Sequence, residues 1–282
     1  MHLPLALFLA DLLLYALAGA AAGFLGGLLG IGGGLLIVAA LTVTLPASGV
    51  VGPDIIHVAV GTSLAGMVLT FGASTIAHYR TGNIMAATWV RLAPGMVIGT
   101  LIGTQLEGFM SGLMLRLAIT LFCAVTAWRM GFSGEKTQRE HSYTPSSHWL
   151  FPSGIVIATV SSIVGIGGGS LTVPLLISLG VKPVRAVATS AACGLVIACA
   201  AAALNMVLRH PVTHAVGQSQ PLGHPWGLVG TVYLPAAITA ALASTLTARS
   251  GVRVANRLSG RALKRSFAVF LLIIGGIIAV GG

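Results

Sequence analysis

The stretch Gly19–Ala40 reads GAAAGFLGGLLGIGGGLLIVAA, an apolar run of small residues that breaks at Gly32, Gly33 and Gly34. Glycine adopts backbone angles that other residues avoid, so this triplet predicts that one helix ends and another begins. An imperfect copy, SGIVIATVSSIVGIGGGSLTVPLL, occupies Ser153–Leu176. A duplicated break inside an apolar run indicates two related halves, each with an interrupted membrane helix.

The composition points to lipid as the solvent. The chain has 282 residues, of which 56% are hydrophobic and 7% are charged, whereas soluble domains carry about 25% charged residues. The formal net charge is +10, but no basic face carries interleaved aromatic residues, which argues against nucleic-acid binding. We expect no enzyme activity, cofactor or metal site, because the sequence has no nucleotide-binding motif, catalytic motif or tight set of metal ligands.

Hydropathy divides the chain into ten apolar segments. They lie at about residues 7–29, 35–46, 55–77, 88–107, 112–130, 150–166, 170–180, 184–208, 226–248 and 264–281. The segments 35–46 and 170–180 directly follow the glycine breaks and are shorter than the ~20 residues that a spanning helix needs. We therefore expect broken or re-entrant helices there, and leave open whether they cross the membrane or return.

The distribution of basic residues predicts the orientation. With the N-terminus outside, all Lys and Arg residues except Arg116 and Arg209 fall on the cytoplasmic side, as the positive-inside rule requires. The polar stretch 132–149 then becomes a cytoplasmic linker between a first membrane repeat, 1–131, and a second, 150–282. Each repeat has five segments, an odd number, so the fold class is an all-α polytopic membrane protein with two inverted-topology repeats and both termini outside.

Two hydroxyl pairs extend the internal repeat. Thr62 and Ser63 lie in HVAVGTSLAG, and Thr189 and Ser190 lie in RAVATSAACG. These hydroxyls could donate hydrogen bonds to an oxyanion, or they could bond the backbone of their own helices, as Ser and Thr often do in membranes. Both interpretations stay open at this point.

The glycine breaks suggest an anion site. A helix that begins after a break offers unpaired N–H groups and a positive dipole end, so two such ends could bind an anion without a basic side chain. The candidate substrate-binding residues are the two hydroxyl pairs together with Gly32, Gly33, Gly34, Gly167, Gly168, Gly169 and Ser170. The alternative is that the glycines only allow close helix packing.

Other polar residues are weaker candidates. His78, Arg116 and Asn205 are read as gate or proton-linked groups, and the spacing that aligns the two hydroxyl pairs also aligns His78 with Asn205. His57 and Asp54 are expected to be solvated at the outer end of a span. No acidic side chain is expected inside a span, which disfavours a proton pump built on carboxylates.

With these residues in view, the chain resembles the sulfite exporter TauE/SafE (TSUP) family in GLLGIGGGLLIV, SIVGIGGGSLTVPLL, the two hydroxyl pairs and the His78–Gly82 segment. The resemblance implies a secondary transporter that moves small sulfur-containing anions, such as sulfite, thiosulfate or sulfonates, across a bacterial inner membrane by alternating access. Its partners would be the anion and membrane lipid, with a coupling ion and the oligomeric state left open. The alternatives are a channel for a small anion or solute and a non-transporting membrane scaffold.

Overall fold

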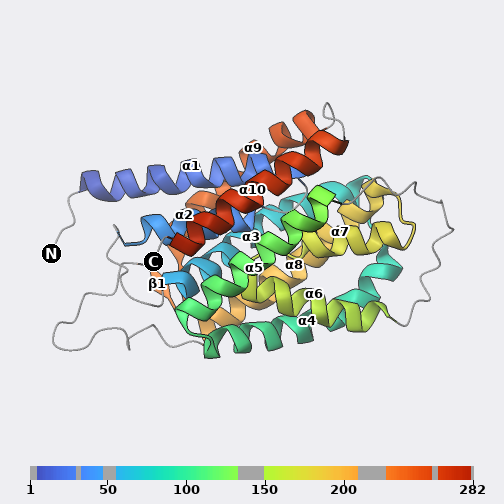
Figure 1. Ribbon diagram of the computed structural model, residues 1–282, viewed down its shortest axis with the longest axis horizontal. Coiled ribbons are helices and arrows are strands. Elements are labelled where there is room, and N and C mark those ends of the chain that lie inside the picture. Colours follow the sequence, from blue (N-terminus) through green and yellow to red (C-terminus); the bar gives the residue numbers. More distant parts are fainter. Residues whose placement is uncertain are drawn as a thin grey trace.

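The computed structural model describes residues 5–29, 33–46, 55–132, 149–208, 227–255 and 260–280. These residues form ten α-helices and one short β-hairpin, bundled side by side (Figure 1). The elements are α1 Leu5–Leu29, α2 Gly34–Thr44, α3 Ile55–Arg80, α4 Ala86–Phe109, α5 Gly112–Phe132, α6 Leu150–Val164, α7 Gly169–Ser178, α8 Pro183–Val207, β1 Leu228–Val229, β2 Val232–Tyr233, α9 Leu234–Ala255 and α10 Gly260–Val280.

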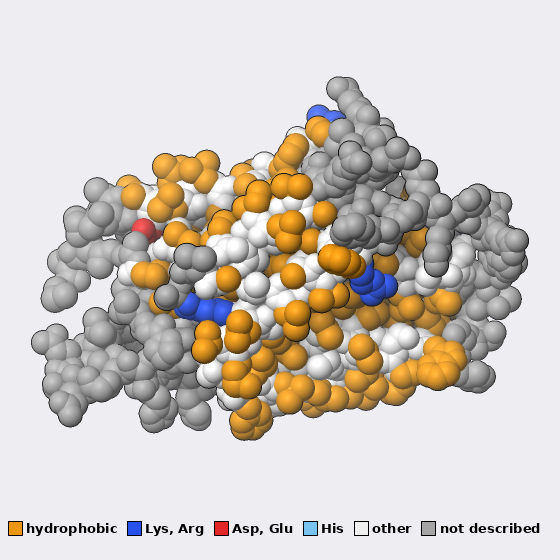
Figure 2. Space-filling view, in the orientation of Figure 1, with side chains coloured by type: hydrophobic (Ala, Val, Ile, Leu, Met, Phe, Trp, Pro, Cys, Tyr) orange, Lys and Arg blue, Asp and Glu red, His pale blue; other side chains and the backbone are white. Residues whose placement is uncertain are grey.

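The helices have the length and surface of membrane spans. In the part of the chain that the structure describes, α1, α3, α4, α5 and α8 are long and apolar enough to cross a bilayer. Large apolar side chains such as Leu117 and Leu121 of α5 are exposed, and Figure 2 shows hydrophobic side chains spread over the visible face. An all-α polytopic membrane protein is thereby confirmed.

Both expected helix breaks are present. Gly33 and Gly168 precede α2 and α7 with φ angles of 72° and 73°, a left-handed conformation that costs other residues about 1–2 kcal/mol. A helix of 11 or 10 residues is about 15–17 Å long, roughly half of the ~30 Å hydrocarbon core. The segments after the breaks are therefore half-helices.

The helix contacts are exchanged between the two halves of the chain. Helix α1 packs on α9 and α6 packs on α4, while α3 packs on α8 and α5 on α10. Matching the helices of the two halves in order makes α6 the counterpart of α1 and α9 the counterpart of α4. The contact of α1 with α9 is then the counterpart of the contact of α6 with α4. This pattern agrees with two repeats related by a twofold axis. The linker boundaries stay a prediction, because residues 133–148 lie outside the described residues.

One segment differs from the expectation. The span predicted at 226–248 begins only at Leu234 and continues to Ala255. The residues before it form the hairpin of β1 and β2, because Gly227 and Gly230 take φ angles of 94° and 58° and turn the chain. Periodicity and hydropathy alone do not distinguish such a short apolar hairpin from the first turns of a helix.

Candidate functional site

The two glycine breaks lie in contact. The hydroxyl of Ser63, on α3, is 3.0 Å from the carbonyl oxygen of Gly34 and 3.2 Å from that of Gly165. A Cβ atom on Gly34 would lie 2.6 Å from the same Gly165 oxygen. The start of α2 and the end of α6 therefore meet at one buried serine, although they are far apart in the sequence.

Close packing is also the geometry of the neighbouring glycines. The aromatic ring of Phe71 lies against both Gly167 and Gly194, and a Cβ atom on Gly194 would come within 2.6 Å of the Gly167 carbonyl oxygen. Gly34 and Gly167 are therefore closely packed, and their role in substrate binding stays a prediction. Gly32 lies outside the described residues.

The two threonines of the hydroxyl pairs bond to the opposite half of the chain. Thr62 Oγ1 accepts a hydrogen bond from the amide of Tyr233 at 2.9 Å, and Thr189 Oγ1 accepts one from the amide of Met85 at 3.0 Å. Tyr233 and Met85 are the residues just before α9 and α4. Amides at a helix start have no acceptor within the helix, so each threonine satisfies a helix start in the other half.

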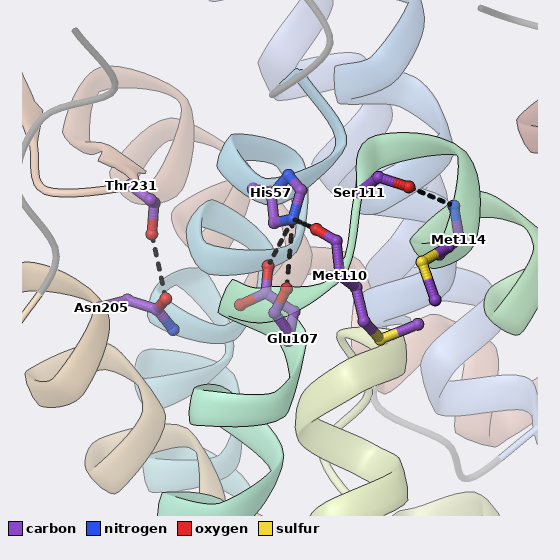
Figure 3. Close-up of polar contacts among 7 residues, drawn as sticks. All are labelled: His57, Glu107, Met110, Ser111, Met114, Asn205 and Thr231. Atoms are coloured by element: carbon purple, nitrogen blue, oxygen red, sulfur yellow. Dashed lines mark hydrogen bonds and ion pairs between the residues drawn. The ribbon is translucent and has the colours of Figure 1, made fainter. Parts of the chain in front are cut away.

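The equivalence of His78 and Asn205 is visible in the backbone. The carbonyl of His78 accepts from the amide of Asn83 at 3.2 Å, and that of Asn205 accepts from the amide of Thr231 at 3.2 Å. Asn205 is buried, donates to the Ala201 carbonyl at 2.9 Å and accepts from the Thr231 hydroxyl at 3.0 Å (Figure 3). It anchors the hairpin.

His78 is far from the breaks along its helix. His78 lies near the end of α3, fifteen residues beyond Ser63, which is about 22 Å along a helix. Arg116 is half-buried near the start of α5. Their roles as gate or proton-linked groups stay predictions.

Unpartnered hydroxyls concentrate at the second break. We call Ser161, Ser162, Ser170 and Thr172 the hydroxyl cluster; all four are buried, and their side-chain oxygens have no hydrogen-bond partner among the described residues. By contrast, Thr42 and Thr44 of α2 bond the carbonyls of their own helix. A buried hydroxyl without a partner costs about 1–3 kcal/mol, so a partner outside the protein is expected here.

Part of the cluster lies at the beginning of a half-helix. A Cβ atom on Gly168 would lie 3.5 Å from Ser161 Oγ, while Gly169 and Ser170 open the first turn of α7. The amides of Leu171 and Thr172 donate to the Gly168 carbonyl at 3.2 and 2.8 Å. Those of Gly169 and Ser170 have no acceptor within the helix, and the dipole makes this end positive. Hydroxyl donors beside such a helix end suit a small anion. Ser190, next to Thr189, is also buried.

A comparison of the two repeats, position by position, could have identified Ser161 and Ser162 from the sequence. At the positions that correspond relative to Gly33, the first half of the chain has Gly26, Gly27, Leu35 and Ile37. The two breaks thus share a backbone conformation, but only the second carries these hydroxyls. The candidate polar residues are therefore found where the second repeat differs from the first, and not where the two repeats agree.

Two expectations about ionisable groups are wrong. His57 is 6% exposed and Glu107 is 1% exposed, so neither is a solvated side chain. Because α4 continues to Phe109, Glu107 belongs to its last turn, where its carboxylate oxygen lies 3.8 Å from His57 Nε2 (Figure 3). Asp54 lies outside the described residues.

Comparisons with known proteins agree with the membrane fold. A family model described as sulfite exporter TauE/SafE matches residues 15–278. A "Probable membrane transporter protein" of Haemophilus influenzae is 33% identical, over 93% of this chain and 96% of its own length. One of Methanocaldococcus jannaschii is 26% identical over 95% of both chains. No solved structure gives a significant match. These relatives are named as transporters and not as enzymes.

Proposed function

Because the chain belongs to the sulfite exporter TauE/SafE family, we propose that this multi-pass membrane transporter moves a small sulfur-containing oxyanion, of the sulfite, thiosulfate or sulfonate type. The observation that carries the proposal is the hydroxyl cluster, Ser161, Ser162, Ser170 and Thr172, at the positive end of α7. The cluster offers several donors, and none of its four members is basic. It therefore suits an anion that must be bound and then released.

Binding would pair these donors with the anion. The hydroxyls of Ser161 and Ser170 and the first amides of α7 would each donate to an oxyanion oxygen, which removes the desolvation penalty of the unpaired groups. Gly168 and Gly169 allow the anion to approach the backbone, since they carry no side chain. Gly33, Gly34 and Ser63 would act by holding the first break against the second.

Transport would require the halves to move relative to each other. The Ser63 hydroxyl joins Gly34 to Gly165, and Phe71 lies against Gly167, so the two breaks are held in contact. Rocking of one half against the other would break this contact and open the site to one side at a time. We further propose a bacterial inner-membrane location with both termini outside, which the distribution of basic residues supports.

The test is uptake of labelled thiosulfate and sulfite into proteoliposomes. We expect Ser161→Ala, Ser170→Ala and Thr172→Val to raise KM about tenfold or more each, the equivalent of about 1.4 kcal/mol of lost binding. Thermal stability should be unchanged or higher, because an unpaired buried hydroxyl contributes nothing to the empty protein. Thr70→Val is the matched control, since its hydroxyl bonds only the Met67 carbonyl of its own helix.

The same assay separates the alternatives. A carrier shows saturable flux and exchange of internal for external anion, whereas a channel shows flux that follows the gradient without exchange. A scaffold would give no flux above empty vesicles. Wild-type kinetics in all three cluster variants would remove the hydroxyl cluster from the mechanism.

A further inference from the structure

His57 and Glu107 form a buried titratable pair where the first turn of α3 meets the last turn of α4. Their exposed fractions are 6% and 1%, and His57 Nε2 lies 3.8 Å from Glu107 Oε1. Figure 3 shows the two side chains directed toward each other. The pair is separate from the glycine breaks and the hydroxyl cluster. Ionisable groups buried among membrane helices are expensive to maintain and mark ion or proton sites.

The hydrogen bonds of His57 fix one of its two ring protons. Nε2 lies 3.2 Å from the carbonyl oxygen of Glu107 and 3.1 Å from that of Met110. Carbonyl oxygens only accept hydrogen bonds, so Nε2 carries a hydrogen and donates it. The charge of the ring therefore depends on Nδ1 alone. The ring is neutral when Nδ1 carries no hydrogen and is an imidazolium when Nδ1 is protonated.

The surroundings of Glu107 make its charge depend on His57. Burial disfavours a carboxylate, and the last turn of α4 exposes carbonyl groups whose negative dipole end also opposes it. A neighbouring imidazolium has the opposite effect and stabilises the carboxylate. A positive charge on His57 and a negative charge on Glu107 therefore favour each other.

Few other charged groups face this pair. In the parts of the elements packed on α3 and α4 that the structure describes, α2 and α6 carry no ionisable side chain. At this end of the bundle the other described groups include Tyr233 of β2 and Arg116 of α5. Two groups of α1 lie close to Tyr233, namely Asp11, whose charge acts on it, and Tyr15, whose ring contacts its ring. The other arginines of α5, α8 and α9 lie toward the far ends of their helices, and Cys123, Cys193 and Cys199 lie within α5 and α8.

The buried face of α4 connects the pair to the hydroxyl cluster. A Cβ atom on Gly103 would lie 3.0 Å from the Cβ atom of Ser162. Thr104 and Glu107 continue the same buried face, and Glu107 is one turn, about 6 Å, beyond Gly103. A change of charge at the pair is therefore felt by an anion at the cluster, because interactions between charges are poorly screened in a dry interior.

We propose that His57 and Glu107 bind one exchangeable proton that travels with the anion. The proton binds His57 Nδ1 or a Glu107 carboxylate oxygen from the solution on one side and leaves the same atom to the other side, with no other bond changed. The added positive charge favours the anion, and by linkage the bound anion raises the proton affinity of the pair. This inference rests on the proposed function, because it assigns the coupling ion of that transport.

The experiment counts protons taken up when thiosulfate, which does not titrate near neutral pH, binds the purified full-length protein. Calorimetric titrations in two buffers with different ionisation enthalpies give that number. We expect proton uptake in the wild type and in Asp11→Asn, the matched acid on α1. In Glu107→Gln and His57→Gln we expect thiosulfate binding with the uptake lost, and in Glu107→Asp, which keeps a carboxyl group, uptake retained.

The possible results distinguish failure of the proton site from failure of the proposed anion transport. Thiosulfate binding without proton uptake in the wild type, or equal uptake in Glu107→Gln, overturns the proton site and leaves anion transport standing. If the wild type binds no thiosulfate, thiosulfate is excluded as a substrate. Infrared difference spectra between acid and alkaline pH then test whether the His57–Glu107 pair binds a proton. A protonated-carboxyl band that titrates in the wild type and is missing in Glu107→Gln supports the site, and a spectrum without that band overturns it.

Discussion

The hydroxyl oxygen of Thr189 accepts a hydrogen bond from the amide of Met85 at 3.0 Å, across 104 residues of sequence. The corresponding bond of the other repeat joins Thr62 to the amide of Tyr233. These two contacts hold the starts of α4 and α9 against helices of the opposite half. Their removal tests whether the two halves stabilise each other.

We predict that Thr189→Val and Thr62→Val each lower the free energy of unfolding by about 1–3 kcal/mol, because each leaves a helix-start amide unpaired while keeping the side-chain shape. Reversible unfolding in mixed micelles measures the loss. Amide hydrogen exchange should rise at the start of α4 in the first variant and of α9 in the second. Thr70→Val, whose hydroxyl bonds its own helix, should exchange like the wild type at both sites.

The Ser63 contact between the two glycine breaks should contribute as much to stability as the Thr62 and Thr189 contacts. Ser63→Ala removes the only side chain that the described structure shows bonded to both Gly34 and Gly165, and we expect a loss of about 1–3 kcal/mol. Ser178→Ala is the control, since that hydroxyl is exposed and bonds the Leu175 carbonyl one turn earlier. A control as destabilised as Ser63→Ala would contradict a specific role for the contact.

The positive φ angles of the breaks can be separated from their packing. Gly82 has a φ angle of 67° and nothing within 4 Å of an added Cβ, so Gly82→Ala should cost only the backbone term of about 1–2 kcal/mol. Gly33→Ala and Gly168→Ala should cost more, because their Cβ atoms would also meet Ala22 and Ile197. Thermal unfolding of the three variants ranks them, and equal losses would show that packing at the breaks contributes nothing.

Asn205 should anchor the hairpin that precedes α9. Asn205→Leu removes the acceptor of the Thr231 hydroxyl and the donor to Ala201, and we expect a loss of about 1–3 kcal/mol. Hydrogen exchange should increase in β1 and β2. Asn83→Leu is the matched variant, because Asn83 bonds only the exposed Thr81 hydroxyl through its side chain, and it should change stability by no more than about 0.5 kcal/mol.

Hydropathy predicted the helices well because lipid imposes one simple requirement on every span, a long apolar run with its backbone bonds satisfied internally. The glycine triplets located the breaks because Gly33 and Gly168 need a left-handed backbone. The onset of α9 was misplaced because the hairpin before it is equally apolar.

The partners of polar side chains were harder to predict. The internal repeat aligned Thr62 with Thr189, but each of them bonds an amide in the other half, and such contacts depend on tertiary packing. His57 was expected to be solvated because it lies near the end of a span, and no acidic side chain was expected inside a span. The burial of His57 and Glu107 follows from how α3 and α4 cross, which the periodicity of either helix does not reveal.

The exchanged threonine contacts have a consequence for the origin of the chain. A polypeptide with only one half would present a threonine acceptor and an unsatisfied helix start, with no way to join them internally. Two identical copies inserted in opposite directions would satisfy both at once. An ancestral antiparallel homodimer, later fused into one gene, would thus have possessed these contacts before the fusion, and the halves expressed as separate polypeptides should still find each other in the bilayer.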